Sequence, residues 1–458
     1  MKQTIRVALA ATMLGCAQLA SATNWFELQN NEAPGAPAFK LWGFIQPQFV
    51  HNEGDAVSGI SAPPGLKAYN GQTALFNQVA PDQNSRDQFQ IFRARPGIRG
   101  VIPGTDGQIN YFLLGEIGNN GLTRKDPAVL SDATVTFNYI PGARIRIGQG
   151  RLPLGEEAMQ GVQLLDYINY SNVTDNLLNE RFVTPYSTTR PTSPILGVPL
   201  ASSQVVGAVS GYRDVGVEVY DWFNRGKWEY AYGVMLSNGN GSEFSDNNSS
   251  KDLTARLQAA YIFGGKGPLR EDVMAYIWHQ GGKRTFSGVD YNREREGVGF
   301  KYLRNGLRFS GEYMSGKGMI FIGPNPPFND IGGTTAFEPV NLIALADSNK
   351  ADGYYLDTGW RFAKKWEADL RYDRLNRLTN SAFDERKFTT WTLGGQYFYS
   401  PKLRFNLNYE IRKLEAPAPG TKGLTGTAAQ QATQLTDANI IGNSMGNRIS
   451  VQMTYVFN

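Results

Sequence analysis

Cysteine and histidine are almost absent from this sequence of 458 residues. The only cysteine is Cys16, and the only histidines are His51 and His279. Because Cys16 lies in a segment that we expect to be cleaved off, the mature chain is expected to hold neither a disulfide nor a cysteine-ligated metal. The sequence also lacks metal-ligand spacings and the Gly-x-x-x-x-Gly-Lys motif of phosphate-cradling loops. We therefore expect no cofactor and no metal site.

Long hydrophobic runs are the second absence. Beyond the N-terminus no stretch approaches the roughly 18 consecutive apolar residues of a transmembrane helix, which excludes a helical membrane protein. The mean hydropathy of −0.36 suits a soluble protein, but it also suits a transmembrane barrel, in which only alternate residues face lipid. The 51 glycines, 22 tyrosines and 25 phenylalanines favour the barrel, although the length also suits a soluble two-domain enzyme. The net charge of +4 indicates no nucleic-acid partner.

The first 22 residues have the features of a secretory signal peptide. Two basic residues precede an apolar run at 7–14, and an Ala-Ser-Ala sequence at 20–22 provides a small-residue cleavage site. We expect the mature chain to begin near Thr23. A lipoprotein cleavage site at Cys16 is the alternative.

Alternating apolar and polar residues recur from residue 40 to the end of the chain. In the segment at 251–263, Leu253 and Leu257 share one face and Arg256 lies on the other, because successive side chains of a strand point to opposite sides. About sixteen strands are predicted in this way, at 40–51, 89–102, 108–117, 132–140, 143–150, 211–223, 228–236, 251–263, 272–279, 293–303, 307–315, 352–362, 366–375, 388–398, 403–413 and 446–457.

The connections between these strands alternate strictly between short and long. Short turns such as 103–107 and 141–142 are followed by long polar loops, at 52–88, 118–131, 151–210, 237–250, 280–292, 316–351, 376–387 and 414–445. An outer-membrane barrel has short periplasmic turns and longer outer loops, and only a closed barrel leaves no unpaired strand edge in lipid. The prediction is an all-β fold, a transmembrane antiparallel β-barrel at 40–458 with a periplasmic N-terminal segment at 23–39. An even strand number places both termini in the periplasm.

Aromatic residues near the strand ends fit the two girdles that such barrels place at the membrane interfaces. The residues assigned to the girdles are Trp42, Tyr139, Trp222, Trp228, Tyr261, Trp360, Trp366, Trp391 and Tyr455. A buried core position is the alternative interpretation of any one of them.

Basic residues gather on the strand face opposite the apolar one. If the apolar face contacts lipid, the pore lining consists of Arg93, Arg95, Arg99, Arg144, Arg146, Arg256, Lys301, Arg308 and Arg371. Arginine keeps its charge at any relevant pH and binds oxyanions with its planar fork, so this lining favours anions. The same face also carries acidic residues, namely Glu116, Asp252, Glu312, Asp357, Asp369 and Glu410. Salt bridges between the two sets are the structural alternative.

The connection at 151–210 is far longer than an ordinary loop, and it has too many apolar residues for a solvated linker. We expect it to fold into the barrel as a constriction loop. Its charged residues are Arg151, Glu156, Glu157, Asp166, Asp175, Glu180, Arg181 and Arg190. An acidic loop opposite a basic wall would set up a transverse field across the pore, which orders water and polar solutes without a sharp choice of sign.

Several stretches resemble the phosphate-selective porin O and P family of Gram-negative outer membranes. They are 147–156, 179–181, 212–218, and 237–241 followed by 252–257. The resemblance spans the mature chain and is closest at 144–263. It implies a passive, trimeric channel of about sixteen strands whose third outer loop folds inward. No lysine occurs between Arg151 and Ser210, so a lysine cluster for phosphate selection cannot lie on that loop.

We predict an outer-membrane porin for small hydrophilic solutes with a mild anion preference, and not an enzyme. Its expected partners are outer-membrane lipid, small hydrophilic or anionic solutes, and two further copies of the chain. A selective phosphate or oxyanion channel is the first alternative. A barrel that scaffolds a partner protein is another, and so is a lipid hydrolase that pairs His279 with Ser310 or Ser315.

Overall fold

The structure is a computed structural model of the chain. It describes residues 24–28, 31–33, 35–59, 87–120, 128–180, 212–241, 245–265, 270–286, 288–321, 343–380, 385–415, 417 and 427–457. The predicted signal peptide at 1–22, Arg181, and the rest of the predicted constriction loop to residue 210 lie outside these residues.

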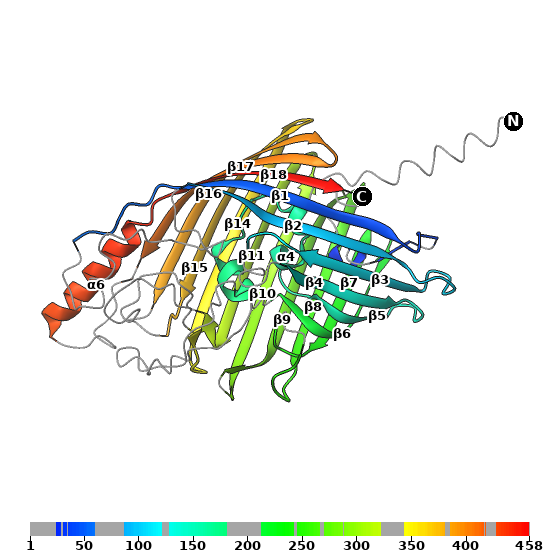
Figure 1. Cartoon of the computed structure of the whole chain (residues 1–458), viewed down its shortest axis with the longest axis horizontal. Coiled ribbons are helices and arrows are strands. Elements are labelled where there is room, and N and C mark those ends of the chain that lie inside the picture. The colour runs from blue at the N-terminus through cyan, green and yellow to red at the C-terminus, as the bar shows by residue number, and fades with distance from the viewer. Residues whose placement is uncertain are drawn as a thin grey trace.

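Sixteen strands form one closed antiparallel barrel, in which each strand pairs with its neighbours along the chain and β1 pairs with β18 (Figure 1). The strands are β1 (Lys40–Asn52), β2 (Asp87–Val101), β3 (Ile109–Glu116), β4 (Val129–Phe137), β5 (Arg144–Arg151), β6 (Arg213–Arg225), β7 (Trp228–Ser237), β8 (Asp252–Gly264), β9 (Glu271–Phe286), β10 (Val289–Arg304), β11 (Leu307–Gly318), β14 (Lys350–Ala363), β15 (Trp366–Arg377), β16 (Arg386–Ser400), β17 (Leu403–Glu415) and β18 (Arg448–Phe457). The short strands β12 (Ile320–Phe321) and β13 (Ile343–Ala344) pair separately.

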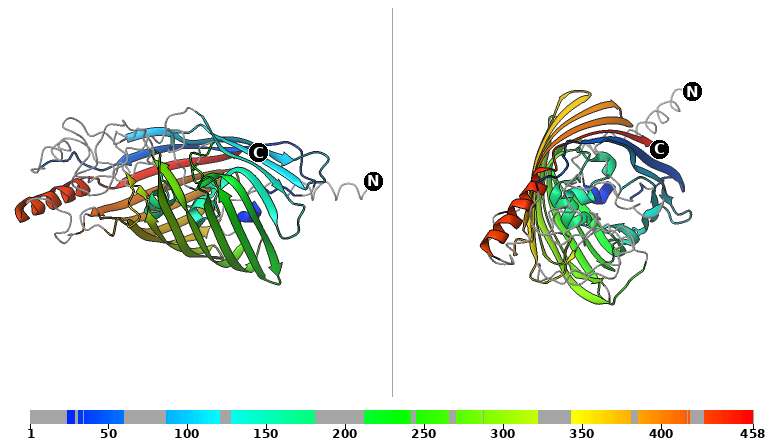
Figure 2. Two further views of the ribbon diagram at one scale, coloured as in Figure 1. Left: turned by 90° about the horizontal axis from the view of Figure 1, so that it is seen from below. Right: turned by 60° about the vertical axis from the view of Figure 1, so that its left-hand side comes forward.

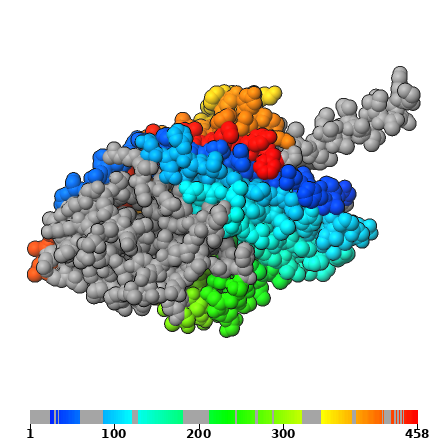
Figure 3. All heavy atoms as spheres, viewed as in Figure 1, coloured from blue at the N-terminus to red at the C-terminus, as the bar shows by residue number. Residues whose placement is uncertain are grey.

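The alternation of side chains decides which face of each strand is outside. In β8, Leu253 is 50% and Leu257 is 56% exposed on the outer wall, whereas Arg256 is fully buried inside. Closure pairs the backbone of both edges of every barrel strand, as a lipid environment requires. In the space-filling view the first strands, in blue and cyan, lie against the last strand, in red, where the barrel closes (Figure 3). The predicted transmembrane barrel of about sixteen strands is confirmed.

The hairpin of β9 and β10 differs from the prediction. A long loop was expected at 280–292, but the two strands stay paired up to Phe286 and Val289. The alternate residues of this extension, among them Gln280, Arg284 and Arg293, are buried inside the barrel. The polarity of these residues led to the prediction of a loop, but their side chains point into the charged interior of the barrel.

Apart from one helix of 16 residues, the helical segments of the described structure are short. They are α2 (Trp25–Leu28), α4 (Glu156–Met159), η1 (Val162–Leu164), α5 (Asn172–Thr174), the π-helical turn η2 (Asp175–Asn179) and α6 (Ala428–Asn443). Helix α6 projects beyond one end of the barrel, while α4 and its neighbours lie within the ring of strands (Figures 1 and 2). None of the helices among the described residues is long and apolar enough to cross a membrane.

The N-terminal segment does not lie free outside the barrel. The sequence placed residues 23–39 in the periplasm, but Trp25 and Phe26 are each only 1% exposed and contact lumen side chains. Residues 35–39 then follow the barrel rim, where the Val101 amide donates to the Pro37 carbonyl at 3.2 Å. Trp25 and Phe26 are shielded from water because they lie inside the barrel. The sequence did not predict this position, because so short a segment shows no hydrophobic periodicity.

Two predicted girdle residues also point inward. Trp42 packs edge-on against Phe44 inside the barrel, and the Arg144 guanidinium lies 4.2 Å from the ring centre of Trp222. The tryptophans that remain on the outer wall are about half exposed, as expected for an interface: Trp228, Trp360, Trp366 and Trp391.

Candidate functional site

All nine basic residues predicted to line the pore lie on the inner face of the barrel. Arg99 and Arg144 are near one end, with side chains 17% and 28% exposed, and they pair with Glu32 and Asp221. The other seven are at most 4% exposed: Arg93, Arg95, Arg146, Arg256, Lys301, Arg308 and Arg371. Each of these is bonded to loop or wall groups, as Arg146 is to Glu218. The interior of this barrel is therefore charged and hydrogen-bonded rather than open solvent.

Residues 152–180 of the predicted constriction loop pack against the inner wall. Leu152, Leu154, Leu177 and Leu178 are at most 1% exposed and belong to one apolar cluster with wall residues such as Met314. A solvated loop would leave these leucines in water, so their burial accounts for the inward path. The side chain of Asn172 adds polar anchors, donating to Asp373 Oδ1 at 2.6 Å and to Thr390 Oγ1 at 2.9 Å.

Glu156 joins this inward loop to two strands. Its carboxylate accepts from Arg256 Nη2 at 3.0 Å and from Lys301 Nζ at 2.8 Å. It also accepts from the indole Nε1 of Trp25 at 2.5 Å. Two predicted wall residues and one predicted loop residue thus meet in a single buried ion cluster.

A second carboxylate, that of Glu312 on β11, binds the start of the loop. It accepts from the Glu156 amide at 3.0 Å, from Trp278 Nε1 at 2.6 Å and from the Tyr355 hydroxyl at 3.0 Å. A Cβ at Gly155 would collide with this carboxylate, so only glycine allows the loop to approach so closely.

Arg371 on β15 clamps the middle of the loop. It donates to Glu157 Oε1 at 3.1 Å, to the Asn169 carbonyl at 3.0 Å and to the Tyr170 carbonyl at 3.3 Å. Its guanidinium also lies 4.5 Å from the ring centre of Tyr167. The guanidinium group of Arg371 therefore binds the loop at three residues.

Replacing Arg371 with lysine should loosen the loop without removing the charge, because an ammonium cannot make these bonds together. We expect single-channel current to fluctuate among several levels in Arg371→Lys, while the mean reversal potential stays that of the parent. Lys301→Arg is the control, since it also exchanges one cation for another but at a site with a single carboxylate partner. Equally steady currents in all three proteins would contradict the clamp.

Glu180 ends the described part of the loop in a left-handed conformation, with φ +47°. Its carboxylate lies 2.6 Å from Arg293 Nε, 3.1 Å from Arg284 Nη2 and 3.7 Å from Arg295 Nη2. Burial alone would raise the pKa of Glu180, but the three guanidinium groups outweigh it and hold this pKa below its ordinary value. The remaining loop acid, Asp175, is buried and accepts from Asn179 within η2.

An acid-rich patch surrounds Arg308. Its guanidinium bonds Asp166 of the loop at 2.5 Å, and Asp357 and Asp369 of the wall at 3.0 and 2.6 Å. Glu367 is a fourth carboxylate at 3.4 Å. Beside the patch is a cavity of about 20 Å³, which is room for one water molecule.

A base-rich cluster lies across the barrel. We define it as Arg93, Arg95, Arg151 and Arg213 with the carboxylates of Glu116 and Asp132. Arg95 pairs with Glu116 at 2.5 Å, and Arg213 pairs with Asp132 at 3.2 Å. Four cations and two anions leave a formal charge of +2 (4 − 2 = 2). Both Nη atoms of Arg213 and Nη1 of Arg95 are buried and have no hydrogen-bond partner in the part of the chain that the structure describes.

Sequence reasoning missed Arg213 because the alternation reverses beside it. Gly148 has φ +124°, and a Cβ there would collide with the Ala133 carbonyl. The strand β5 therefore carries Arg146 inward before this glycine and Arg151 inward after it, although their numbers differ in parity. Arg213 pairs in register with Arg151 and turns inward with it. A glycine in the middle of a strand was the available signal.

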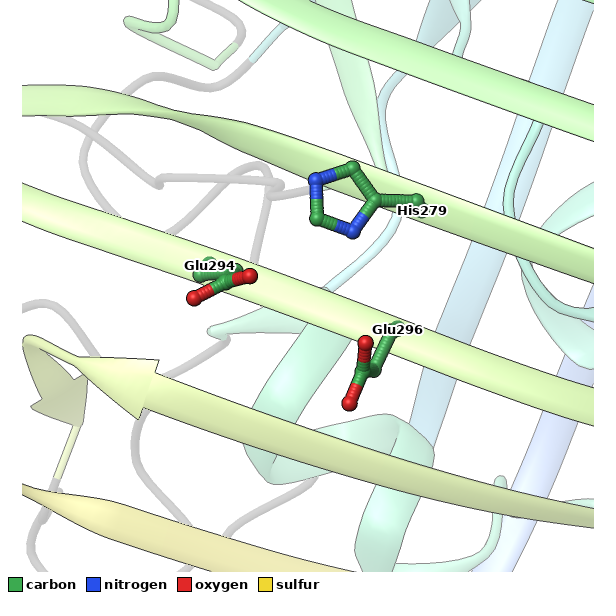
Figure 4. A group of neighbouring side chains, drawn as sticks. All are labelled: His279, Glu294 and Glu296. Atoms are coloured by element: carbon green, nitrogen blue, oxygen red, sulfur yellow. The ribbon is translucent and has the colours of Figure 1, made fainter.

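A group of possible metal ligands lies away from these clusters, on the outer wall. His279 on β9 and Glu294 and Glu296 on β10 have ligand atoms within 4.8 Å of one another (Figure 4). Sequence spacing did not show them, because register and not sequence brings them together. Ser315 donates to Glu296 at 2.9 Å, and Lys317 lies 3.9 Å from Glu294. Since these partners already occupy the carboxylates on an exposed surface, we assign no metal there.

The serines considered for hydrolysis are not bonded to His279. Ser310 is buried inside the barrel and donates to Asp357, whereas His279 is exposed outside. The hydroxyl of Ser315 donates to Glu296. Within the described residues, neither serine has the imidazole as the base that a nucleophile needs.

Comparison with known proteins gives the same architecture. The sequence profile of the family named phosphate-selective porin O and P matches residues 344–436, rather than the stretches near 144–263 where the resemblance was closest. No curated protein sequence matches the chain significantly. The anion-selective porin from Comamonas acidovorans superposes with a TM-score of 0.50 at 16% identity, covering 92% of this chain and 99% of that one.

Two further solved structures are similar with lower scores. OmpF of Salmonella typhi, solved in complex with daunomycin, is 13% identical with a TM-score of 0.46, covering 92% of this chain and 97% of that one. The outer membrane channel DcaP of Acinetobacter baumannii is 10% identical with a TM-score of 0.45, covering 93% and 99%. The chain is a 16-stranded porin-type barrel, and its sequence matches the phosphate-selective porin O and P family, the family predicted from the sequence, over residues 344–436.

Proposed function

We propose that this chain is an outer-membrane porin that lets small hydrophilic solutes diffuse through its lumen with a mild preference for anions. The observation that carries the proposal is the base-rich cluster, whose formal charge is +2 and in which both buried Nη atoms of Arg213 have no hydrogen-bond partner among the described residues. Such groups can bind a partly dehydrated anion without first breaking an internal bond. The porin from Comamonas acidovorans, which shares the fold and is anion-selective, agrees with this sign.

The preference is mild because the opposite wall is acidic. Around the barrel, the strands of the acid-rich patch, β11, β14 and β15, lie about half a circumference from β2, β4, β5 and β6 of the base-rich cluster. A permeating ion therefore meets both signs of charge at once. Such a transverse field orients polar solutes more than it excludes either ion.

A selective oxyanion channel is the second candidate. The Nη atoms of Arg213 and the Nη1 atom of Arg95, which have no hydrogen-bond partner among the described residues, favour it, since tetrahedral oxyanions fit paired N–H donors. It requires that millimolar phosphate block chloride current. We propose the channel in preference to a catalytic or a scaffold role, because the charged clusters on the inner face of the barrel support a lined pore.

The membrane setting follows from the same architecture. We propose that the turns at 226–227 and 305–306 face the periplasm, together with both termini, since β1 begins and β18 ends at one end of the barrel. A homotrimer in outer-membrane lipid is proposed from the family resemblance. Mass measurement of the detergent complex tests the trimer.

Planar-bilayer recording in a salt gradient tests the function. We expect stepwise insertion of open channels and a reversal potential displaced modestly toward that of the anion. A potential at zero would contradict the preference, and a membrane that stays sealed with the parent and with its pore variants would contradict the porin itself. Adding phosphate to the same bilayer distinguishes the two candidates. The chloride current of a pore with a mild anion preference stays the same, whereas that of a selective oxyanion channel falls.

A further inference from the structure

The described residues of a short N-terminal segment, 24–28 and 31–33, occupy part of the lumen. The segment begins beneath the inward loop, where α2 lies beside α4 (Figure 2). From there it leads toward the rim of the barrel and precedes β1. Asn24, Trp25 and Phe26 are at most 1% exposed. Any solute that crosses the barrel on this side must pass these side chains.

Trp25 is held by the inward loop and by the wall. Its indole Nε1 donates to Glu156 at 2.5 Å, and Lys301 Nζ lies 5.3 Å from its ring centre. Glu156 would keep Lys301 and Arg256 as partners if the indole left. Withdrawal of Trp25 therefore leaves no buried charge unpaired, so the free-energy cost of the movement is low.

Phe26 packs on the strands opposite the loop. Its ring stacks on Tyr220 with centres 5.8 Å apart and an interplanar angle of 25°. The same small apolar cluster includes Met159 and Leu164 of the loop and Ala231 of β7. A Cβ added at Gly233 on β7 would lie 2.5 Å from the Phe26 ring, so this glycine makes the space for it.

The segment is attached to the barrel by side chains and not by strand pairing. Among the described residues, the backbone bonds of 24–28 stay within the segment. Near the rim, the Tyr220 hydroxyl donates to Asn31 Oδ1 at 2.9 Å and Glu32 pairs with Arg99. The predicted cleavage after residue 22 frees the chain one residue before Asn24. The segment then has one free end and one end tethered to β1.

We propose that residues 24–28, attached near the rim through 31–33, act as a mobile plug that narrows the pore and opens it by withdrawing toward the rim. The proposal rests on the porin function proposed above. Withdrawal breaks no strand pairing, because among the described residues side chains alone attach the segment to the barrel, and its N-terminal end is free. It also leaves Glu156 paired with Lys301 and Arg256. Because Trp25 and Leu164 belong to one cluster, the plug also supports the inward loop from below.

Bilayer recording of the mature chain tests the plug from two directions. Trp25→Ala combined with Phe26→Ala shortens the plug, whereas Gly233→Leu fills its seat without altering the segment. We expect both to raise unit conductance severalfold and to abolish brief closures. The control is Gly395→Leu, since a Cβ there meets nothing within 4 Å. Unchanged conductance in both plug variants, with normal channels in the parent, overturns the plug.

The outcomes separate the plug from the porin function. If neither the parent nor any variant conducts, the proposed function fails. If only the plug variants conduct, the parent is closed by its own N-terminus and both proposals stand.

Thiol labelling gives a second measurement that does not need current. The predicted mature chain has no cysteine, so Phe26→Cys introduces a single thiol. In the folded protein we expect it to react much more slowly than the exposed control Lys364→Cys, and to become faster when Gly233→Leu is added. Equal reaction rates at 26 and 364 in the parent background overturn the plug, even if a conductance variant fails to fold.

Discussion

Replacing Arg213 with glutamine should move the reversal potential of the channel toward that of cations, with little change in conductance. The substitution lowers the formal charge of the base-rich cluster from +2 to +1 (2 − 1 = 1) and removes the two Nη atoms that have no partner among the described residues. Charge at a narrow, partly dehydrated site dominates ion selection, because the dielectric there is lower than in bulk water. Recording in a tenfold salt gradient measures the shift.

A double variant separates the charge of the cluster from damage to the wall. Arg213→Gln with Asp132→Asn removes both members of one ion pair, so the cluster keeps three arginines and one carboxylate, again +2 (3 − 1 = 2). We expect its reversal potential to return close to that of the parent. Removing one partner of a buried pair costs ~3–5 kcal/mol, so heat resistance should fall in Arg213→Gln and recover in the double variant. Equal reversal potentials in all three proteins would remove this cluster from the ion path.

Excising residues 156–179 and joining the ends with a short glycine linker should produce the largest rise in conductance. This part of the loop fills lumen space with buried side chains such as Leu177 and Asn172. Because it contributes no strand, the barrel ladder remains complete without it. We expect larger sugars to pass the excised protein in liposome-swelling assays, and unit current to increase severalfold.

Removal of α6 is the matched control for this excision. The helix Ala428–Asn443 lies in another long connection, but outside the ring of strands (Figure 1). A deletion of similar length there should leave the sugar cut-off unchanged. If the two deletions have equal effects, the inward loop does not set the width of the pore.

The strand positions could be predicted because each depends only on neighbours in sequence. Leu253, Arg256 and Leu257 show the rule: alternate residues meet lipid and lumen, and the pattern survives whatever the opposite wall contains. The rule failed where backbone geometry changed. At Gly148 a positive φ reverses the alternation, and Arg213, which a count of parity places outside, becomes an inward cation.

The site was less predictable because its contacts span the barrel. Nothing near Glu156 in sequence indicates that Lys301, 145 positions later, and Trp25, 131 positions earlier, share its carboxylate. The charged residue types of the inner face were predicted, since a polar strand face must either contact water or form hydrogen bonds and ion pairs. Their partners were not, because register and closure determine which side chains meet.

The sequence by itself determined that this chain closes into a barrel with a charged interior, because a period of two separates apolar from polar residues along the strands. Only the tertiary structure decided how the interior is filled. The N-terminal aromatic residues, the inward loop and the reversed strand at Gly148 meet at distances that depend on the curvature of the whole wall, and local alternation carries no information about it.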